Sequence, residues 1–174
     1  LLNGIAAQVP PDRMRRIETP PADETALRLC HSADYVALVR REVADGSGAL
    51  STGDVDVCAH SMTAALAAVG TVLGGVEQVL SGAARTAFCV ARPPGHHASA
   101  DRGDGFCLFN NLAIGVRWAQ QRHGLGRVLV VDWDVHHGNG TQDLFYTDPS
   151  VFFFSLHQWL IYPGTGTVHQ TGEG

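Results

Sequence analysis

Two unbroken apolar runs place the strongest constraint on the fold of this chain. They stand in "RVLVVDWD" (127–134) and "SVFFFSLH" (150–157), and each has the length of one β-strand. Apolar residues that follow one another without alternation are typical of strands buried on both faces, as in parallel sheets. Because such runs alternate here with helical patterns, the sequence predicts an α/β domain built around a mainly parallel sheet.

The helices are predicted from the spacing of apolar residues and from end signals. We expect two short helices within 25–43, the second capped by Ser32, and a longer apolar helix over about 61–80. A further helix is expected over 110–124, where Gly124 stands in the position of a C-cap.

Composition narrows the class of protein. A chain of 174 residues with 45% apolar residues fits a single globular domain, and we expect it to be incomplete at both ends. The net charge of −5 gives no basic surface for direct nucleic-acid binding. Four scattered cysteines and the lack of about 18 continuous apolar residues predict a reduced, cytoplasmic protein without a membrane span.

Polar side chains follow each predicted strand. A short buried strand in "TAFCVA" (86–91) breaks at Pro93-Pro94-Gly95 and leads to His96 and His97. The two apolar runs lead to residues 132–137 and 155–157. Binding sites in parallel sheets gather at the carboxyl ends of the strands, so we expect these three polar clusters on one rim.

The stretch "VDWDVHHGNG" (131–140) predicts a metal site. If Asp132, Asp134 and His136 continue the strand, the period of two puts their side chains on one face. Asp134 and His136 suit zinc or a similar divalent ion, which would need a third protein ligand and a water. Asp132 would orient a histidine or bind a second ion. The alternative is that Asp, His and Gly only cap and turn the strand end.

Two imidazoles and several aromatic residues accompany this stretch. His96 and His97 can divide proton transfer, one accepting and one delivering a proton, although a His-His pair is more commonly loop decoration. Phe106 would line an apolar channel or simply pack in the core, and Trp159 and Tyr162 would form the opposite wall or only a tethered loop. Four histidines without a partner cluster are expected at the surface or at helix caps, namely His31, His60, His123 and His169.

Four motifs in this order resemble the zinc-dependent histone deacetylase family, including its bacterial and acetylpolyamine-cleaving relatives. They are "RPPGHHA", "GFCLFNN", "VDWDVHHGNGTQ" and "SLHQW…YPGTG", and the likeness is dense from Arg92 to Gly166 and looser over 25–80. The resemblance implies a three-layer α/β/α, arginase-deacetylase-like fold, with 1–174 as one partial catalytic domain. It also implies hydrolysis of an N-acetyl amide on a lysine side chain or polyamine, which releases acetate and the free amine.

The resemblance implies roles for individual residues. Asp134 and His136 match ligands of zinc, with Fe²⁺ or another divalent ion as the alternative. His96 and His97 match the paired catalytic histidines, and Asp132 the carboxylate bonded to the first of them. Asn139 matches the residue behind the second histidine, where some relatives have Asp. A set of residues also matches the site for a monovalent cation, K⁺ or Na⁺: Asp132, Asp134, His136, Ser155 and Leu156.

The substrate-binding residues are matched in the same way. The carbonyl of Gly105 would accept the substrate amide N–H, and Phe106 and Tyr162 would form the walls of the acyl tunnel, where Tyr162 departs from a common Phe. Asp54 would be a carboxylate at the rim that holds the substrate backbone. The expected partners are an acetylated lysine peptide or an acetylpolyamine, without direct nucleic-acid or membrane contact, and oligomer formation stays open.

The family places a third zinc ligand and an oxyanion-stabilising Tyr or His beyond the last residue of this sequence. From two ligands we expect weak metal binding and little activity in this polypeptide alone. Two alternatives to a protein deacetylase therefore stay open: an enzyme for small acetylated amines, and a catalytically inactive fragment or pseudoenzyme that binds acylated ligands or a protein partner.

Overall fold

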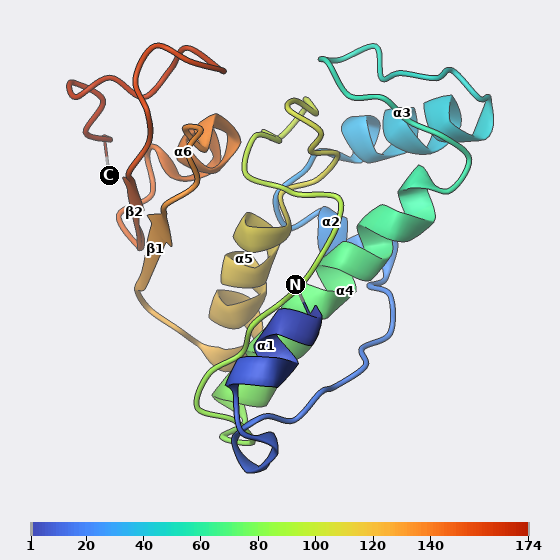
Figure 1. Ribbon diagram of the computed structural model, residues 1–174. Coiled ribbons are helices and arrows are strands. Elements are labelled where there is room, and N and C mark those ends of the chain that lie inside the picture. The colour runs from blue at the N-terminus through green and yellow to red at the C-terminus, as the bar shows by residue number, and fades with distance from the viewer. Residues whose placement is uncertain (1, 174) are drawn as a thin grey trace.

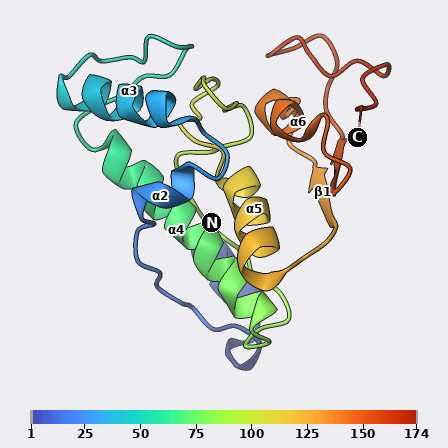
Figure 2. The same ribbon diagram turned by 180° about the vertical axis from the view of Figure 1, so that it is seen from behind.

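The computed structural model describes residues 2–173 and divides them into helices that lead to a parallel strand pair (Figure 1). In chain order the elements are α1 (Leu2–Gln8), a 3-10 turn (Pro11–Arg13), α2 (Glu24–Leu27), α3 (Ala33–Ala44), α4 (Ser61–Leu80), α5 (Asn111–His123), β1 (Val128–Asp132), α6 (Asn139–Phe145) and β2 (Val151–Ser155). Helix α5 stands between the α2–α4 helices and the unit formed by β1, α6 and β2 (Figures 1 and 2).

The two apolar runs form the strand pair. Strands β1 and β2 are parallel, in a register that pairs Val128 with Val151 and Asp132 with Ser155. Helix α6 connects them and packs against β2. The expected α/β class with a parallel sheet is therefore confirmed, and the carboxyl ends of both strands meet at one edge.

The prediction that both strands are fully buried is wrong. Val130 and Val151 are buried under α5 and α6, whereas Leu129 and Phe152, which point to the opposite face, are 63% and 68% exposed. Side chains alternate between the two faces of a strand, and residues 2–173 place helices on one face only. The continuous apolar runs thus predicted where the strands lie, but they did not predict which strand faces are covered by helices within residues 2–173.

The helix ends follow the predicted signals. The Ser32 hydroxyl accepts a hydrogen bond from the Tyr35 amide at 3.2 Å, which caps α3. The Asn110 side chain accepts from the Ala113 amide at 3.0 Å and caps α5, which ends at Gly124 with φ = 68°. Glycine adopts this left-handed conformation without strain, so the C-cap prediction is confirmed.

Helix α4 is the centre of the helical half. It is long and apolar enough to cross a membrane by length and composition, with a mean hydropathy of 1.4 over 18 residues, contrary to our expectation from the sequence. Its residues Ala65, Val69 and Leu73 lie in the core with residues of α2 and α3 and with Ile114 of α5. This packing is that of the core helix of a folded domain.

The strand expected over 86–91 is also corrected. Residues 85–90 are exposed and form no ladder with β1 or β2. This segment runs along α4 instead, where the Cys89 thiol lies 3.5 Å from the Thr71 carbonyl oxygen. A strand needs a neighbouring strand whose backbone groups are free to form hydrogen bonds. The backbone groups of α4 are already bonded within the helix, so this segment cannot pair with α4 as a strand.

Candidate active site

The chain leaves β1 through two consecutive turns made by its own carboxylates. Asp132 Oδ1 accepts from the Asp134 amide at 3.1 Å, and Asp134 Oδ1 accepts from the His136 amide at 2.8 Å. Strand β1 ends at Asp132, so the prediction that all three side chains line one face of an extended strand is wrong. Short carboxylate side chains compete for backbone N–H groups and favour turns over continued pairing.

These turns nevertheless bring two candidate metal ligands together. His136 Nδ1 lies 3.1 Å from Asp134 Oδ1, and both side chains are half-exposed at the strand end. Two ligands of a tetrahedral zinc ion stand about 3.3 Å apart, so an oxygen and a nitrogen at this spacing fit two positions of one ion. Within residues 2–173 no group of three or more such side chains is arranged to hold a metal.

The electrostatic setting of Asp134 favours its charged form. Burial raises the pKa of this carboxyl, but the hydrogen bond from the His136 amide and the nearby His96 ring outweigh that effect and leave the pKa lowered. A carboxylate that stays ionised is ready to bind a cation at neutral pH.

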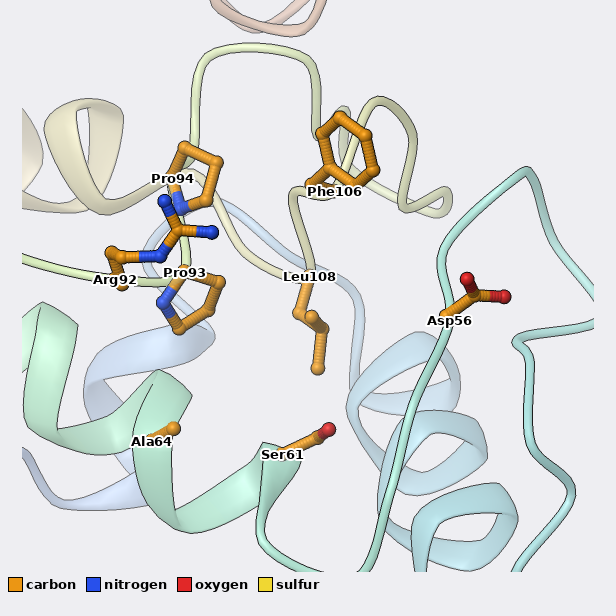
Figure 3. A pocket seen from close by; sticks show the side chains of 8 residues that line it. All are labelled: Asp56, Ser61, Ala64, Arg92, Pro93, Pro94, Phe106 and Leu108. Atoms are coloured by element: carbon orange, nitrogen blue, oxygen red, sulfur yellow. The ribbon is translucent and has the colours of Figure 1, made fainter.

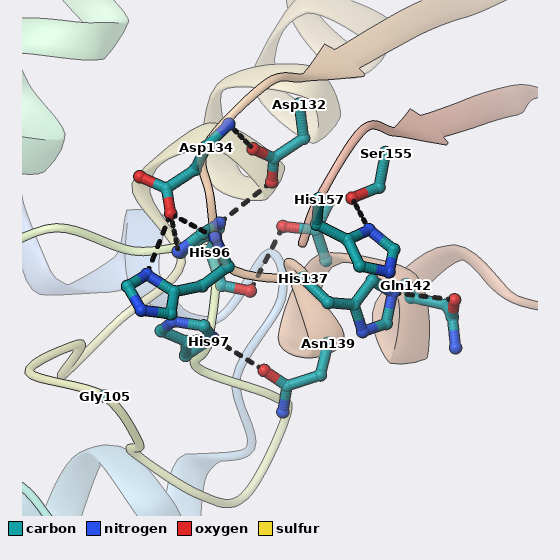
Figure 4. Close-up of polar contacts among 12 residues, drawn as sticks. His96, His97, Gly105, Asp132, Asp134, His137, Asn139, Gln142, Ser155 and His157 are labelled. Atoms are coloured by element: carbon teal, nitrogen blue, oxygen red, sulfur yellow. Dashed lines mark hydrogen bonds and ion pairs between the residues drawn. The ribbon is translucent and has the colours of Figure 1, made fainter. Parts of the chain in front are cut away.

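His96 is held by the residue that ends β1 (Figure 4). Its Nδ1 lies 2.9 Å from Asp132 Oδ2. Since an ionised carboxylate can only accept, Nδ1 carries a proton, and in the neutral ring Nε2 keeps its lone pair. The Nε2 atom lies 4.0 Å from Asp134 Oδ1, so this basic nitrogen faces the candidate metal ligands.

His97 lies beside His96 and is held by a neutral partner. Its Nδ1 is 2.7 Å from Asn139 Oδ1, at the first residue of α6, and the two imidazole rings are 4.0 Å apart between centroids. Burial lowers the pKa of His97, and the nearby His96 and His136 act in the same direction, while the bond to Asn139 acts against them. His97 is therefore neutral at pH 7, again with Nε2 unprotonated.

Glycines on both sides of Asn139 allow this close approach. A Cβ atom at Gly138 would lie 2.4 Å from Asp132 Oδ2, and one at Gly140 would lie 2.3 Å from the Ala98 carbonyl oxygen. Neither distance is sterically possible without a shift of these groups. The sequence "GNG" thus lets the start of α6 pack directly against the turn that carries the histidines.

The predicted substrate-binding residues also gather at His97. Asp54 Oδ1 accepts from the Gly105 amide at 2.7 Å and from the Tyr162 hydroxyl at 3.4 Å. The Tyr162 ring stands edge-on to His97, with centroids 5.0 Å apart. Gly105 has φ = 51°, and a Cβ there would lie 2.3 Å from His97 Cδ2. Residues more than a hundred positions apart therefore form one rim above this ring.

Phe106 follows Gly105 and is 72% exposed. It borders a pocket of about 290 Å³ between α4 and the turn at 92–94 (Figure 3). The pocket is lined by Asp56, Ser61, Ala64, Arg92, Pro93, Pro94, Phe106 and Leu108. This ring is thus open to a ligand rather than packed in the core, as the channel interpretation requires.

Sequence reasoning missed Asp104. Its carboxyl lies 3.3 Å from the Arg102 guanidinium. Burial raises the pKa of the Tyr162 phenol, and the carboxyls of Asp104 and Asp54 raise it further. The only signal in the sequence was the position of Asp104 directly before Gly105.

Ser155 and Leu156 lie beside Asp132 at the end of the strand pair. The Leu156 amide donates to the Asp132 carbonyl oxygen at 2.8 Å, and the Ser155 hydroxyl lies 2.8 Å from His157 Nδ1. The structure therefore brings these two members of the predicted cation set to the same strand end as Asp132, and Asp134 and His136 follow within the two turns.

The surface assignment of His31 is wrong. This residue is buried, and its Nε2 accepts from the Asn110 amide at 2.9 Å. Burial lowers its pKa from 6.5 to about 4. The Asn110 side chain in turn donates to the Ala98 carbonyl and to the Thr141 hydroxyl, so His31 supports the connection between α5 and the histidine turn.

Comparisons with known proteins agree with this geometry. A family profile described as "Histone deacetylase domain" matches residues 2–174. The chain is 39% identical over 164 residues to "Histone deacetylase 10, chloroplastic" from Oryza sativa subsp. japonica, which covers 88% of this chain and 37% of that protein. It is 45% identical over 152 residues to "Polyamine deacetylase HDAC10" from Homo sapiens, which covers 84% of this chain and 23% of that protein.

A solved structure is similar as well. The "Crystal Structure of HDA15 HD domain" matches with a TM-score of 0.89 at 35% identity, over 99% of this chain and 49% of that one. The chain thus spans less than half the length of each of these relatives.

Proposed function

The chain belongs to the histone deacetylase family, and from this membership and the site geometry we propose that it serves zinc-dependent hydrolysis of an N-acetyl or other acyl amide on a lysine side chain or a polyamine. One observation carries the proposal. Two adjacent imidazoles are each fixed through Nδ1, with Nε2 unprotonated, beside an aspartate and a histidine spaced as ligands of one ion.

Asp134 and His136 are the proposed zinc ligands in this chain. A bound zinc ion polarises the amide carbonyl and brings the pKa of a bound water to about 7. The carboxylate and the imidazole orient themselves through the hydrogen bonds of the two turns, so they need little rearrangement to bind.

His96 and His97 are the proposed proton-transfer residues. The Asp132 carboxylate favours a proton on Nδ1 of His96 and makes its Nε2 a stronger base, so His96 accepts the proton of the attacking water. Asn139 holds His97 without a negative charge, which makes the imidazolium of His97 easier to deprotonate. His97 starts with a bare Nε2, so the proton that it delivers to the leaving amine is one that it first accepts in the site, from the water whose other proton His96 takes.

The rim residues are proposed to hold the acyl chain. The Gly105 carbonyl would accept the substrate N–H, and the rings of Phe106 and Tyr162 would flank the methylene groups. Asp54 is proposed as the carboxylate facing the substrate backbone, in addition to its bonds within the chain. At the strand ends we propose a K⁺ or Na⁺ ion held by oxygens near Asp132, with the further members Asp134, His136, Ser155 and Leu156.

The substrate is a peptide or a small amine. The carboxyls of Asp54 and Asp104 near the mouth favour a cationic molecule, and one relative is named a polyamine deacetylase, which supports acetylpolyamines as a second candidate substrate. The same rim would also accept the backbone of an acetyl-lysine peptide.

The test is a deacetylation assay on the zinc-loaded protein with an acetyl-lysine peptide and N-acetylputrescine, in which released acetate is measured. Because this chain supplies two zinc ligands, we expect slow hydrolysis of at least one substrate at saturating zinc, and its loss in His97→Ala. Hydrolysis that survives this substitution unchanged would sink the mechanism. Binding of either substrate without any hydrolysis would favour the non-catalytic alternative.

A further inference from the structure

A second pair of imidazoles, His137 and His157, lies beside the site and has no part in the proposed chemistry (Figure 4). His137 directly follows the candidate ligand His136 but is only 2% exposed, and His157 follows β2. Their ring centroids are 4.7 Å apart. Two buried or half-buried histidines at the edge of a site need a physical role, since burial of a polar ring without partners is costly.

All four ring nitrogens of this pair are engaged. His137 Nε2 lies 3.0 Å from Gln142 Oε1, and its Nδ1 lies 2.8 Å from the Thr165 hydroxyl. His157 Nε2 lies 3.0 Å from the Gly166 carbonyl oxygen, and its Nδ1 lies 2.8 Å from the Ser155 hydroxyl. The amide and carbonyl oxygens only accept and the hydroxyls can donate, so one neutral form, with the proton on Nε2, satisfies each ring.

Two of these partners lie in the segment 157–167, which carries Tyr162. The backbone at Gly166 rests on the pair: its φ is 86°, and a Cβ there would lie 2.5 Å from His157 Nε2 and 2.6 Å from His137 Cγ. Any side chain at this position would displace the segment. The close approach shows that the imidazoles define where the end of the segment lies.

The segment is attached at three places. At its start the Gln158 amide donates to the Val135 carbonyl at 2.9 Å. At its end the two histidines bind Thr165 and Gly166, and the Gln170 side chain accepts from the Gly166 and Thr167 amides. Between them the Tyr162 hydroxyl reaches across to Asp54 at 3.4 Å, and the Tyr162 ring stands edge-on to His97 and His136. This long contact is weaker than the bonds at the end, so the end bonds contribute more than the Asp54 contact to holding the segment that carries the Tyr162 ring.

We propose that His137 and His157 are positioning residues that fix segment 157–167, so that the ring of Tyr162 stands against His97 and sets the width of the acyl slot. The consequence for substrates rests on the proposed function; the consequence for the segment does not. Neither ring touches the reacting atoms, because every nitrogen is already bonded within the chain.

The test uses three variants of the whole protein. His157→Ala removes both bonds of that ring. His157→Gln places an amide N–H close to the position of Nε2 and is expected to restore the bond to Gly166. His169→Ala is the matched control, since His169 is an exposed histidine of the same part of the chain.

Two measurements are made on each variant: hydrogen exchange of the backbone amides, and equilibrium binding of an Nε-acetyl-lysine peptide by NMR titration. In His157→Ala we expect exchange at 158–167 to accelerate roughly fivefold to tenfold, as for the loss of one net hydrogen bond, with α4 and α5 unchanged. We expect Kd for the peptide to rise roughly threefold to tenfold, because the slot wall is less preorganised. His157→Gln and His169→Ala should stay within about twofold of the parent.

The outcomes separate the claims. Unchanged exchange at 158–167 in His157→Ala, or acceleration that extends equally to α4, would overturn the inference, as would a faster segment with an unchanged Kd. A His157→Gln variant as impaired as His157→Ala would also count against it. If the parent protein itself binds no acetyl-lysine peptide, the proposed function fails for that substrate, and the exchange measurement alone decides whether the histidines fix the segment.

Discussion

Within residues 2–173, His96 and His97 each use one ring nitrogen for a hydrogen bond, whereas His137 and His157 each use both. The two pairs are alike in residue type and spacing, with ring centroids 4.0 Å and 4.7 Å apart. The first pair keeps a basic nitrogen for a substrate or water, and the second has none left. The number of engaged nitrogens, rather than burial or proximity, separates a candidate catalytic pair from a positioning pair.

The largest expected difference between the pairs is in turnover. His97→Gln removes the unprotonated Nε2, and we expect kcat/KM of the zinc-loaded protein for its best acetylated substrate to fall by about 10²- to 10⁴-fold. The same replacement at His157 should leave kcat/KM within about twofold of the parent, since the glutamine amide is expected to restore the bond to Gly166. Steady-state kinetics on both variants check this, and equal losses would erase the distinction between the pairs.

His31, which belongs to neither pair, shows the effect of burial alone on the pKa of a histidine. The pKa of His31 is lowered to about 4 in the folded chain, against about 6.5 when unfolded, so folding favours its neutral form. Its contribution is fully present above pH 6.5 and is lost as the pH falls towards 4, by about 3 kcal/mol.

Urea unfolding at pH 7 and pH 4 measures this loss, and His31→Gln should show a shallower dependence on pH. Parallel curves for the parent and the variant would mean that His31 is not the buried group that titrates.

The second pair should matter for the free energy of unfolding, in contrast to its small effect on turnover. His137→Ala removes a buried ring and its two hydrogen bonds, to the half-buried Gln142 and the exposed Thr165, and we expect the free energy of unfolding to drop by about 2 kcal/mol. His169→Ala, at an exposed position, should change it by less than about 0.5 kcal/mol. Urea titration at pH 7 tests both, and indistinguishable midpoints would show that the His137 bonds do not stabilise the fold.

The smallest effect sharpens the contrast within the first pair. Asn139→Asp places a carboxylate on Nδ1 of His97, as Asp132 does for His96, and we expect the pKa of His97 to rise by about one unit. A pH titration of the His97 ring signals in the metal-free protein measures this rise. A pKa that stays where it is would mean that Asn139 does not control the charge of His97.

The sequence was informative where local physics decides. Periodicity and cap residues predicted α4 and α5 almost to the residue, and the apolar runs predicted β1 and β2. The candidate site also assembled as expected around His97, although its members are far apart in the chain. These predictions depend on short-range patterns, or on sequence motifs that resemble those of a known family and occur in the same order along the chain.

Predictions failed where the outcome depends on what lies next to a segment. The run at 86–91 has the composition of a strand, but it lies along α4 and has no strand partner. Burial of β1 and β2 on both faces was inferred from the same kind of pattern, and Leu129 and Phe152 are exposed. In both cases the outcome depends on which element packs against the segment, and the residues of the segment do not determine that.

Histidine roles were the least predictable feature. His31 was expected at the surface or at a helix cap; it is buried and accepts from the amide of Asn110, a partner 79 positions away that the sequence does not reveal. The pairing of His137 with His157 was not predicted, because their bonds to Thr165 and Gly166 depend on a turn for which the sequence contains no recognisable signal. A ring with two nitrogens takes its role from its partners, and these are fixed by tertiary structure.

The most direct test of this contrast is a long-range ¹H–¹⁵N correlation spectrum of the histidine rings in the metal-free protein at pH 7.5. The hydrogen-bond partners predict a proton on Nδ1 and a bare Nε2 for His96 and His97, and the reverse, a proton on Nε2, for His137 and His157. A proton on Nε2 of His96 or His97, or a mixture of both forms in His137 or His157, would contradict the division into a catalytic and a positioning pair.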